Sequence, residues 1–226
     1  AESIRRDEEA LELYVGVPVG PQRWQAGLRA TTTFHKVKRA DEAYARLREL
    51  QADGDADEET RRDAYLLEAE LRKDDNNPDG ELDAYARALA AFPDEKQLLY
   101  ARALMWERRD DIPRAEADFR KILAIDADDV NALNALGYTL ADRTDRYQEA
   151  LELTRRAALA AQQVHLPESL YLWQWQTGRL LRHLGDVHPA MAAYERAVAT
   201  VQSMRSERLR GPGGGMPSFR TSVSPL

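Results

Sequence analysis

Cysteine is absent from the 226 residues of this chain. The absence excludes disulfide bonds, thiolate metal sites and cysteine nucleophiles, although it leaves the redox compartment open. Histidine is scarce as well, and the four copies are His35, His165, His183 and His188. No two of them stand four residues apart on one helix, which is the spacing that lets two imidazoles share a metal ion. We therefore expect no metal and no cofactor.

Groups typical of catalysis are missing too. The adjacent acid pairs at 74–75, 110–111 and 128–129 lie in predicted turns or at helix N-termini, where carboxylates accept hydrogen bonds from free backbone N–H groups. The glycine-rich run at 211–215 follows no predicted strand and precedes no Lys-Ser/Thr pair, so it does not have the pattern of a phosphate-binding loop. The sequence predicts a protein that is not an enzyme.

Long apolar runs and a surplus of basic residues are also lacking. No stretch approaches the roughly 18 residues of a membrane-spanning helix, so we expect no membrane insertion. The net charge is −7, and it is uneven: residues 165–226 hold seven Arg against four acids, about +3, which leaves about −10 for residues 1–164. Because phosphate binding needs a basic stripe, this balance disfavours nucleic acid as a partner.

What the sequence does contain is a repeat of small residues. Gly137 stands 34 residues after Ala103, and Gly178 stands 41 residues after Gly137. A pattern of alanine, an aromatic or large residue and a further apolar residue follows two of them, at Ala115, Phe119 and Ile122 and again at Ala190, Tyr194 and Ala197. A period in this range is typical of helical-hairpin solenoids.

Helical periodicity and chain breakers divide the chain into helix pairs. Asn77 and Asp94 are candidate N-caps, and Pro78 suits a first helical turn. We expect a first helix over 4–15, then one hairpin made of helices 22–37 and 41–52 and another made of helices 58–73 and 78–91. Three further hairpins are expected over 94–127, 128–163 and 168–207. The sequence therefore predicts an all-α fold, a right-handed solenoid of about five hairpins.

Three stretches carry a known consensus: 87–94 (RALAAFPD), 133–141 (LNALGYTLA) and 184–197 (LGDVHPAMAAYERA). They resemble the tetratricopeptide repeat, whose small residue lets two helices approach closely and whose aromatic ring fills the gap to the next repeat. The resemblance implies a non-catalytic scaffold that binds a peptide or a partner protein on its concave surface.

The same resemblance implies which residues contact that partner. In tetratricopeptide proteins the first helix of each hairpin lines the concave surface, and fixed positions of that helix face the ligand. Aligned on Ala103, Gly137 and Gly178, these positions form three groups. They are Gln97, Tyr100, Glu107 and Arg108; Asn131, Asn134, Tyr138 and Asp142; and Trp175, Arg179 and Arg182.

The third group contains a strip of aromatic and basic residues. Trp175, Arg179 and Arg182 follow an i, i+4, i+7 spacing, which suits an acidic peptide or a C-terminal carboxylate. The two asparagines of the middle group share a face and can pair with a peptide backbone. Trp173 and Trp175 diverge by about 200° on a helix, so they cannot both point into the core. The alternative for Trp175 is that it packs against the helix that follows.

A finer resemblance divides the chain. Residues 1–160, notably the stretch 126–153, are similar to periplasmic or lipoprotein-type tetratricopeptide proteins of Gram-negative bacteria. Residues 158–226, notably 157–181 and 218–226, resemble the repeats that precede a caspase-like CHAT domain. One helix near 148–163 fits both patterns, which predicts two repeat segments joined through a shared helix.

The change of charge and the lengthened spacing before Gly178 fall at the same place as this division. We therefore predict three parts. They are a first solenoid segment over 1–163, a hairpin of a second segment over 164–207, and a flexible Gly-rich linker with the truncated start of a further helix over 208–226.

Three functional hypotheses stay open. The first is the interaction scaffold; the second is an engineered or recombined repeat fusion with no native ligand; the third is a regulatory fragment of a larger CHAT-type protease, whose catalytic residues would lie beyond residue 226.

The start at Ala1 without Met indicates an excised or mature fragment. The compartment of a bacterial protein, periplasmic or cytoplasmic, stays open. The solenoid ends predict possible end-to-end self-association.

Overall fold

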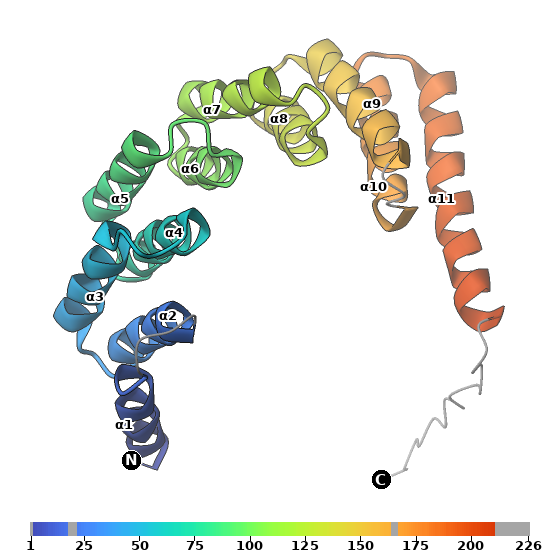
Figure 1. The fold of residues 1–226 in the computed structure, drawn as a ribbon. Helices are drawn as coiled ribbons and strands as arrows, with labels where there is room; N and C mark the ends of the chain where they lie inside the picture. Colours follow the sequence, from blue (N-terminus) through green and yellow to red (C-terminus); the bar gives the residue numbers. More distant parts are fainter. Residues whose placement is uncertain (1, 18–21, 164–166, 211–226) are drawn as a thin grey trace, which may run out of the picture. The chain divides into compact units, whose positions relative to one another are not determined.

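The computed structural model describes residues 2–17, 22–163 and 167–210, and every regular element in these ranges is an α-helix (Figure 1). The bounds follow the expected ranges closely. The linker expected over 208–226 falls largely on residues 211–226, which lie outside the described residues. The helices are α1 (Glu2–Val15), α2 (Gln22–Lys36), α3 (Ala40–Ala52), α4 (Glu58–Asp74), α5 (Pro78–Ala91), α6 (Lys96–Arg108), α7 (Ile112–Ile125), α8 (Val130–Arg143), α9 (Tyr147–Gln163), α10 (Pro167–His183) and α11 (Val187–Arg210).

The helices pair in chain order. Helix α1 is followed by the hairpins α2–α3, α4–α5, α6–α7, α8–α9 and α10–α11. Within α1 to α7, and again within α8 to α11, each helix packs mainly on its neighbours in the chain. The expectation of an all-α helical-hairpin solenoid with about five hairpins is therefore confirmed.

The chain divides into two compact units, Ala1–Ile125 and Asp126–Leu226. The first contains α1 to α7 and the second contains α8 to α11. Helices α9 and α10 lie in the same unit and pack on each other. The joint between two repeat segments near residue 163 stays a prediction about origin.

Short polar residues start several helices. Asn77 caps α5 by accepting a hydrogen bond from the Gly80 N–H at 2.9 Å, with Pro78 as the first helical residue. The expectation that Asp94 caps α6 is wrong. The side chain of Glu95, one residue later, accepts from the Gln97 N–H at 2.9 Å, because the residue that caps is the one with extended backbone directly before the first turn.

The core of the first unit includes the side chains between the first two hairpins. Leu47 and Ala43 are fully buried there, and Leu11 of α1 packs against the same cluster. The exposed residues of α1 include Glu8, Glu9 and Glu12, so its outer face is rich in acidic residues.

A buried ionic cluster lies between α3, α4 and α5. Glu68 of α4 is 1% exposed, and its carboxylate accepts hydrogen bonds from Gln51 at 2.7 Å and from Arg87 at 2.8 Å. Arg87 also donates to the Gln51 amide oxygen at 2.8 Å, and Arg72 stands 3.7 Å from the carboxylate. The cluster therefore links two consecutive hairpins.

The small residues of the second unit stand where helices come closest. A Cβ added at Gly178 of α10 would lie 2.7 Å from the Tyr194 ring of α11, and one added at Gly137 of α8 would lie 3.2 Å from the Thr154 hydroxyl of α9. These distances are shorter than or at the limit of ordinary carbon contacts. The repeat of small residues therefore sets the separation of paired helices, as the spacing predicted.

Candidate partner-binding surface

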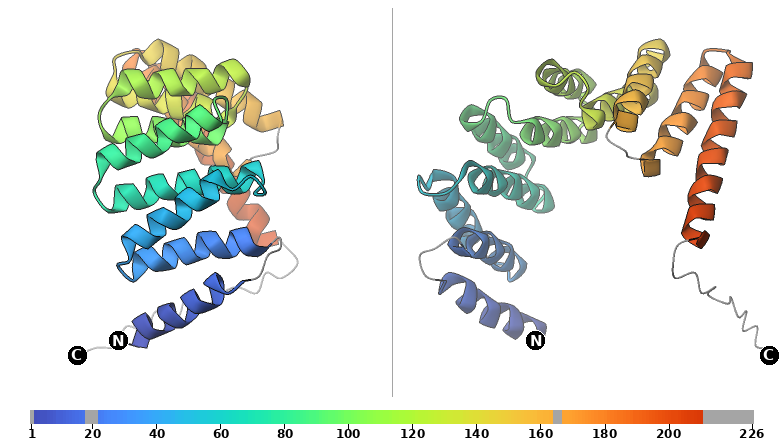
Figure 2. Two further views of the ribbon diagram at one scale, coloured as in Figure 1. Left: turned by 60° about the vertical axis from the view of Figure 1, so that its left-hand side comes forward. Right: turned by 45° about the vertical axis from the view of Figure 1, so that its right-hand side comes forward.

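In the second unit the predicted ligand-facing residues lie on α8 and α10, the first helices of the two hairpins (Figures 1 and 2). These helices are joined by side-chain contacts. The indole N–H of Trp173 donates to the Asn134 amide oxygen at 2.9 Å. Trp173 is only 5% exposed, so it is the core residue of the two neighbouring tryptophans. Asn134 thus has an intramolecular partner.

A second link joins the same two helices. The Arg179 guanidinium forms an ion pair with Asp142, and it lies over the Tyr138 ring, 5.5 Å from the centroid. Hydrogen bonding to the Asp142 carboxylate raises the pKa of the Tyr138 hydroxyl. Arg179 therefore belongs to a three-residue cluster with Tyr138 and Asp142.

Trp175 is exposed but not free of contacts. Its side chain is 56% exposed, and its ring packs against the Tyr194 ring of α11 with 4.9 Å between centroids. The sequence left two interpretations of Trp175 open, a ligand-facing residue and a residue packed on the helix that follows. Each applies in part, because the side chain contacts α11 and also faces solvent. Arg182 is exposed one further turn along α10.

We call five of the predicted ligand-facing residues on α8 and α10 the α8–α10 row; four of them are exposed, and Arg179 is partly buried. Asn131 and Tyr138 are exposed on α8, and Tyr138 retains half of its surface in solvent. The members of the row are Asn131, Tyr138, Asp142, Arg179 and Arg182.

In the first unit the predicted residues of α6 hold hairpins together. The Tyr100 ring meets the Phe119 ring of α7 edge-on at 5.6 Å between centroids. Arg108 forms an ion pair with the buried Glu81 of α5. Gln97 is exposed, and Glu107 is partly buried. Tyr100 and Arg108 therefore have packing partners within the unit.

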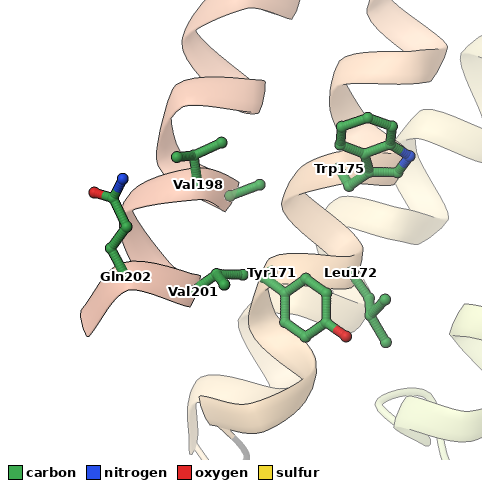
Figure 3. Close-up of a pocket in the computed structure, with 7 residues that line it drawn as sticks. Tyr171, Leu172, Trp175, Val198, Val201 and Gln202 are labelled. Atoms are coloured by element: carbon green, nitrogen blue, oxygen red, sulfur yellow. The ribbon is translucent and has the colours of Figure 1, made fainter. Parts of the chain in front are cut away.

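Sequence reasoning missed an apolar groove between α10 and α11. The groove has a volume of about 430 Å³ (Figure 3). The sequence signal was present, because Val198 and Val201 stand three apart on one face of α11. The residues that line the groove are Tyr171, Leu172, Trp175, Ala197, Val198, Val201 and Gln202.

The described residues contain no group of three His, Asp or Glu side chains placed to hold a metal ion. Within the same residues no helix is both long enough and apolar enough to cross a bilayer.

The helical hairpins, closely packed at small residues, define a helical-repeat protein. No family model matches the chain. The TPR repeat-containing protein PA4667 of Pseudomonas aeruginosa is 37% identical over 157 residues, which cover 70% of this chain and 26% of that protein. The chain therefore spans about a quarter of the length of this curated bacterial relative.

Solved structures agree on the fold. BtubC (BKLC) from P. vanneervenii has a TM-score of 0.68 at 20% identity, with 100% of this chain and 95% of that chain covered. MamA has a TM-score of 0.60 at 12% identity, with 84% and 99% covered. A tetratricopeptide repeat protein from Parabacteroides merdae has a TM-score of 0.55 at 17% identity, with 90% and 77% covered.

The resemblance to tetratricopeptide proteins is confirmed by these comparisons, and the chain is a solenoid of tetratricopeptide-type repeats. The resemblance of residues 158–226 to the repeats before a CHAT domain stays a prediction.

Proposed function

We propose that the chain is a non-catalytic scaffold that binds a partner protein or peptide through the α8–α10 row. Protein–protein interaction is the general role of tetratricopeptide-type proteins, and a repeat solenoid offers an extended binding surface. Gln97 and Glu107 on α6 of the first unit stay a separate prediction of a contact surface on that unit.

One observation carries this proposal: Tyr138 is 52% exposed and yet contacts two charged side chains of its own unit. Arg179 lies over its ring and Asp142 binds its hydroxyl. An exposed aromatic side chain that is already ordered loses little conformational entropy on binding, which is typical of residues that dominate an interface.

The charge of the row favours an acidic segment or a C-terminal carboxylate. Arg182 is exposed, and a guanidinium can bind a carboxylate with two parallel hydrogen bonds. Asn131 on α8 adds an amide that can donate to and accept from a peptide backbone.

Affinity capture from the source organism tests this proposal. The wild-type chain, Tyr138→Ala and the control Leu159→Ala serve as baits; Leu159 of α9 is 61% exposed and lies outside the row. We expect a defined partner that the wild type and the control retain and that Tyr138→Ala loses, with unchanged helical circular dichroism. A partner that binds all three baits equally would place the interface elsewhere.

End-to-end self-association is a further part of the proposal, because Leu13 of α1 and Val198 of α11 are each more than half exposed, and exposed apolar side chains favour contact with another copy. Light scattering over a range of protein concentrations tests it, and a constant monomer mass would exclude it.

A further inference from the structure

The groove between α10 and α11 is a second surface, separate from the α8–α10 row except for its neighbour Trp175. Large apolar side chains from both helices stand partly in solvent there. Leu172 is 53% exposed, Val198 is 53% exposed and Val201 is 45% exposed. Exposed apolar surface gathered in one hollow is typical of an interaction site.

The groove runs between two helices that lie side by side (Figures 2 and 3). Its walls carry side chains one turn apart, such as Leu172 and Trp175 on α10 and Val198 and Val201 on α11. Two parallel walls of this kind accept the apolar stripe of a third helix, whose anchors recur at i, i+3, i+4 and i+7.

An exposed arginine lies beyond each end of the groove, outside its lining. Arg182 stands seven residues after Trp175, and Arg205 stands seven residues after Val198, and both are exposed. A seven-residue step returns to nearly the same face of a helix. Because α10 and α11 run in opposite directions, the two arginines lie at opposite ends. Residues 167–210 hold six Arg against four acids, in a chain of net charge −7.

This charge pattern selects among occupants. If a second copy paired the same groove with itself about a two-fold axis, arginine ends would meet arginine ends, and like charges would oppose the contact. A helix with carboxylates beyond its apolar stripe meets both arginines favourably. The groove itself is lined on α11 by residues between Ala197 and Gln202. Arg182 lies seven residues beyond Trp175, and Arg205 lies seven residues beyond Val198 in the opposite direction. An occupant that reaches both arginines therefore needs about 14 residues, about four turns or roughly 21 Å.

We propose that the α10–α11 groove binds an amphipathic helix of a partner protein, with an apolar stripe of about four turns and acidic residues at both ends. The apolar stripe fills the groove between Trp175 and Val198, and the end carboxylates pair with Arg182 and Arg205.

The test uses a fluorescein-labelled synthetic helix of about 16 residues, with leucines along one stripe and glutamates at both ends, and a matched peptide with lysines at the ends. Fluorescence anisotropy measures binding to the full chain. We expect the glutamate peptide to bind and the lysine peptide to bind at least about tenfold more weakly. Val198→Glu should weaken the glutamate peptide at least about tenfold, because it places a carboxylate in the apolar wall.

Two variants distinguish the contribution of the apolar lining from that of the flanking charge. Val201→Asn, which adds no charge, should weaken the glutamate peptide several-fold, whereas the control Leu159→Glu on α9 should bind as the wild type does. Arg205→Glu should weaken the glutamate peptide and strengthen the lysine peptide. Circular dichroism confirms that each variant is folded.

Three results would overturn this assignment. The first is equal binding of the glutamate and lysine peptides, and the second is equal weakening of the glutamate peptide by Leu159→Glu and Val198→Glu. The third is that Val198→Glu abolishes self-association and leaves peptide binding unchanged, which would make a second copy the occupant. The proposed function is tested separately: Tyr138→Ala should bind the glutamate peptide normally, and Val198→Glu should retain a partner held by the α8–α10 row.

Discussion

Gly178 controls the distance between two helices at the scale of a single residue. Its lack of a Cβ lets the Tyr194 ring approach the α10 backbone, and the same ring then packs against Trp175. A methyl group at this position must displace a ring that is held on its other side, because packed interiors have little free volume.

Gly178→Ala is therefore expected to lower the free energy of unfolding by about 1–2 kcal/mol, since overpacking outweighs the helix propensity that alanine adds. Urea unfolding followed by circular dichroism measures the change. Gly54→Ala is the control, because nothing lies within 4 Å of its added Cβ. Stabilisation by Gly178→Ala would show that the ring moves freely.

Helix pairs are held by a few polar contacts of long sequence separation. Glu68 is the clearest case, because it is buried and binds groups from α3 and α5. Removing the charge takes away the buried carboxylate that accepts from Gln51 and Arg87, although Arg87 keeps its exposed partner Asp83. Breaking charge-assisted hydrogen bonds of a buried group is costly.

We expect Glu68→Gln to destabilise the chain by about 2–4 kcal/mol in urea unfolding. Asp83→Asn is the matched control. Asp83 also binds Arg87, at 2.8 Å, but is 64% exposed, so its removal should cost less than about 1 kcal/mol. Equal effects of the two changes would argue against a special role for the buried carboxylate.

A second polar link between helices depends on pH. The Tyr44 hydroxyl of α3 donates to Asp75 at 2.6 Å, and His35 of α2 contacts the same carboxylate at 2.8 Å. The hydrogen bond from Tyr44, aided by His35, lowers the pKa of Asp75. The Asp75 carboxylate thus binds a proton more weakly in the folded state than in the unfolded state. Its contribution to the free energy of unfolding is therefore fully present above about pH 4, and it is lost as the pH falls through the lowered pKa of the folded state.

Tyr44→Phe should therefore flatten the decline of Tm on acidification from about pH 5 to about pH 2.5. The readout is the slope and not the Tm itself, because the substitution also removes a hydrogen bond. The control Arg39→Gln removes the ion pair with the exposed Glu42 and the contact of the guanidinium with the Phe34 ring. Because that ion pair is exposed to solvent, the slope should change much less than in Tyr44→Phe. A Tyr44→Phe slope identical to that of the wild type would refute the link.

At the scale of the whole molecule, the hairpins within each compact unit contact mainly their neighbours in the chain, and the stability of each unit should follow that arrangement. A truncation after Ile125 keeps the first compact unit intact, so we expect it to stay folded with its helical content. A truncation after Arg109 removes α7, the hairpin partner of α6, whose residues Leu98 and Ala103 are buried in the full chain. This shorter fragment should unfold at a lower urea concentration than the fragment that ends at Ile125. Loss of all structure in both truncations would contradict a modular solenoid.

The sequence was sufficient for the hairpins because their determinants are local. Asn77 and Pro78 start a helix, and Gly178 and Tyr194 mark a close approach within one hairpin. Contacts between hairpins were not predictable in this way. Periodicity shows that Trp173 and Trp175 point in different directions, but only the packing of α10 on its neighbours shows that Trp173 reaches Asn134, 39 residues away.

The same limit applied to the candidate site. The fixed positions of the repeat located Tyr138 and Arg182 on exposed faces. They did not show that Arg179 is paired with Asp142, because that contact depends on the separation of α8 and α10. The groove beside α11 was missed because the repeat consensus places ligand contacts on the first helix of each hairpin, whereas α11 is a second helix.

The different surroundings of the tryptophans give this chain an intrinsic optical probe. Trp106 and Trp173 are buried and Trp24 is partly buried, whereas the Trp175 indole lies at the edge of the groove with more than half of its surface in water. Water around an indole shifts its emission to longer wavelength, so a molecule that covers the groove should move the spectrum towards the blue. Occupancy can thus be followed in the unlabelled protein.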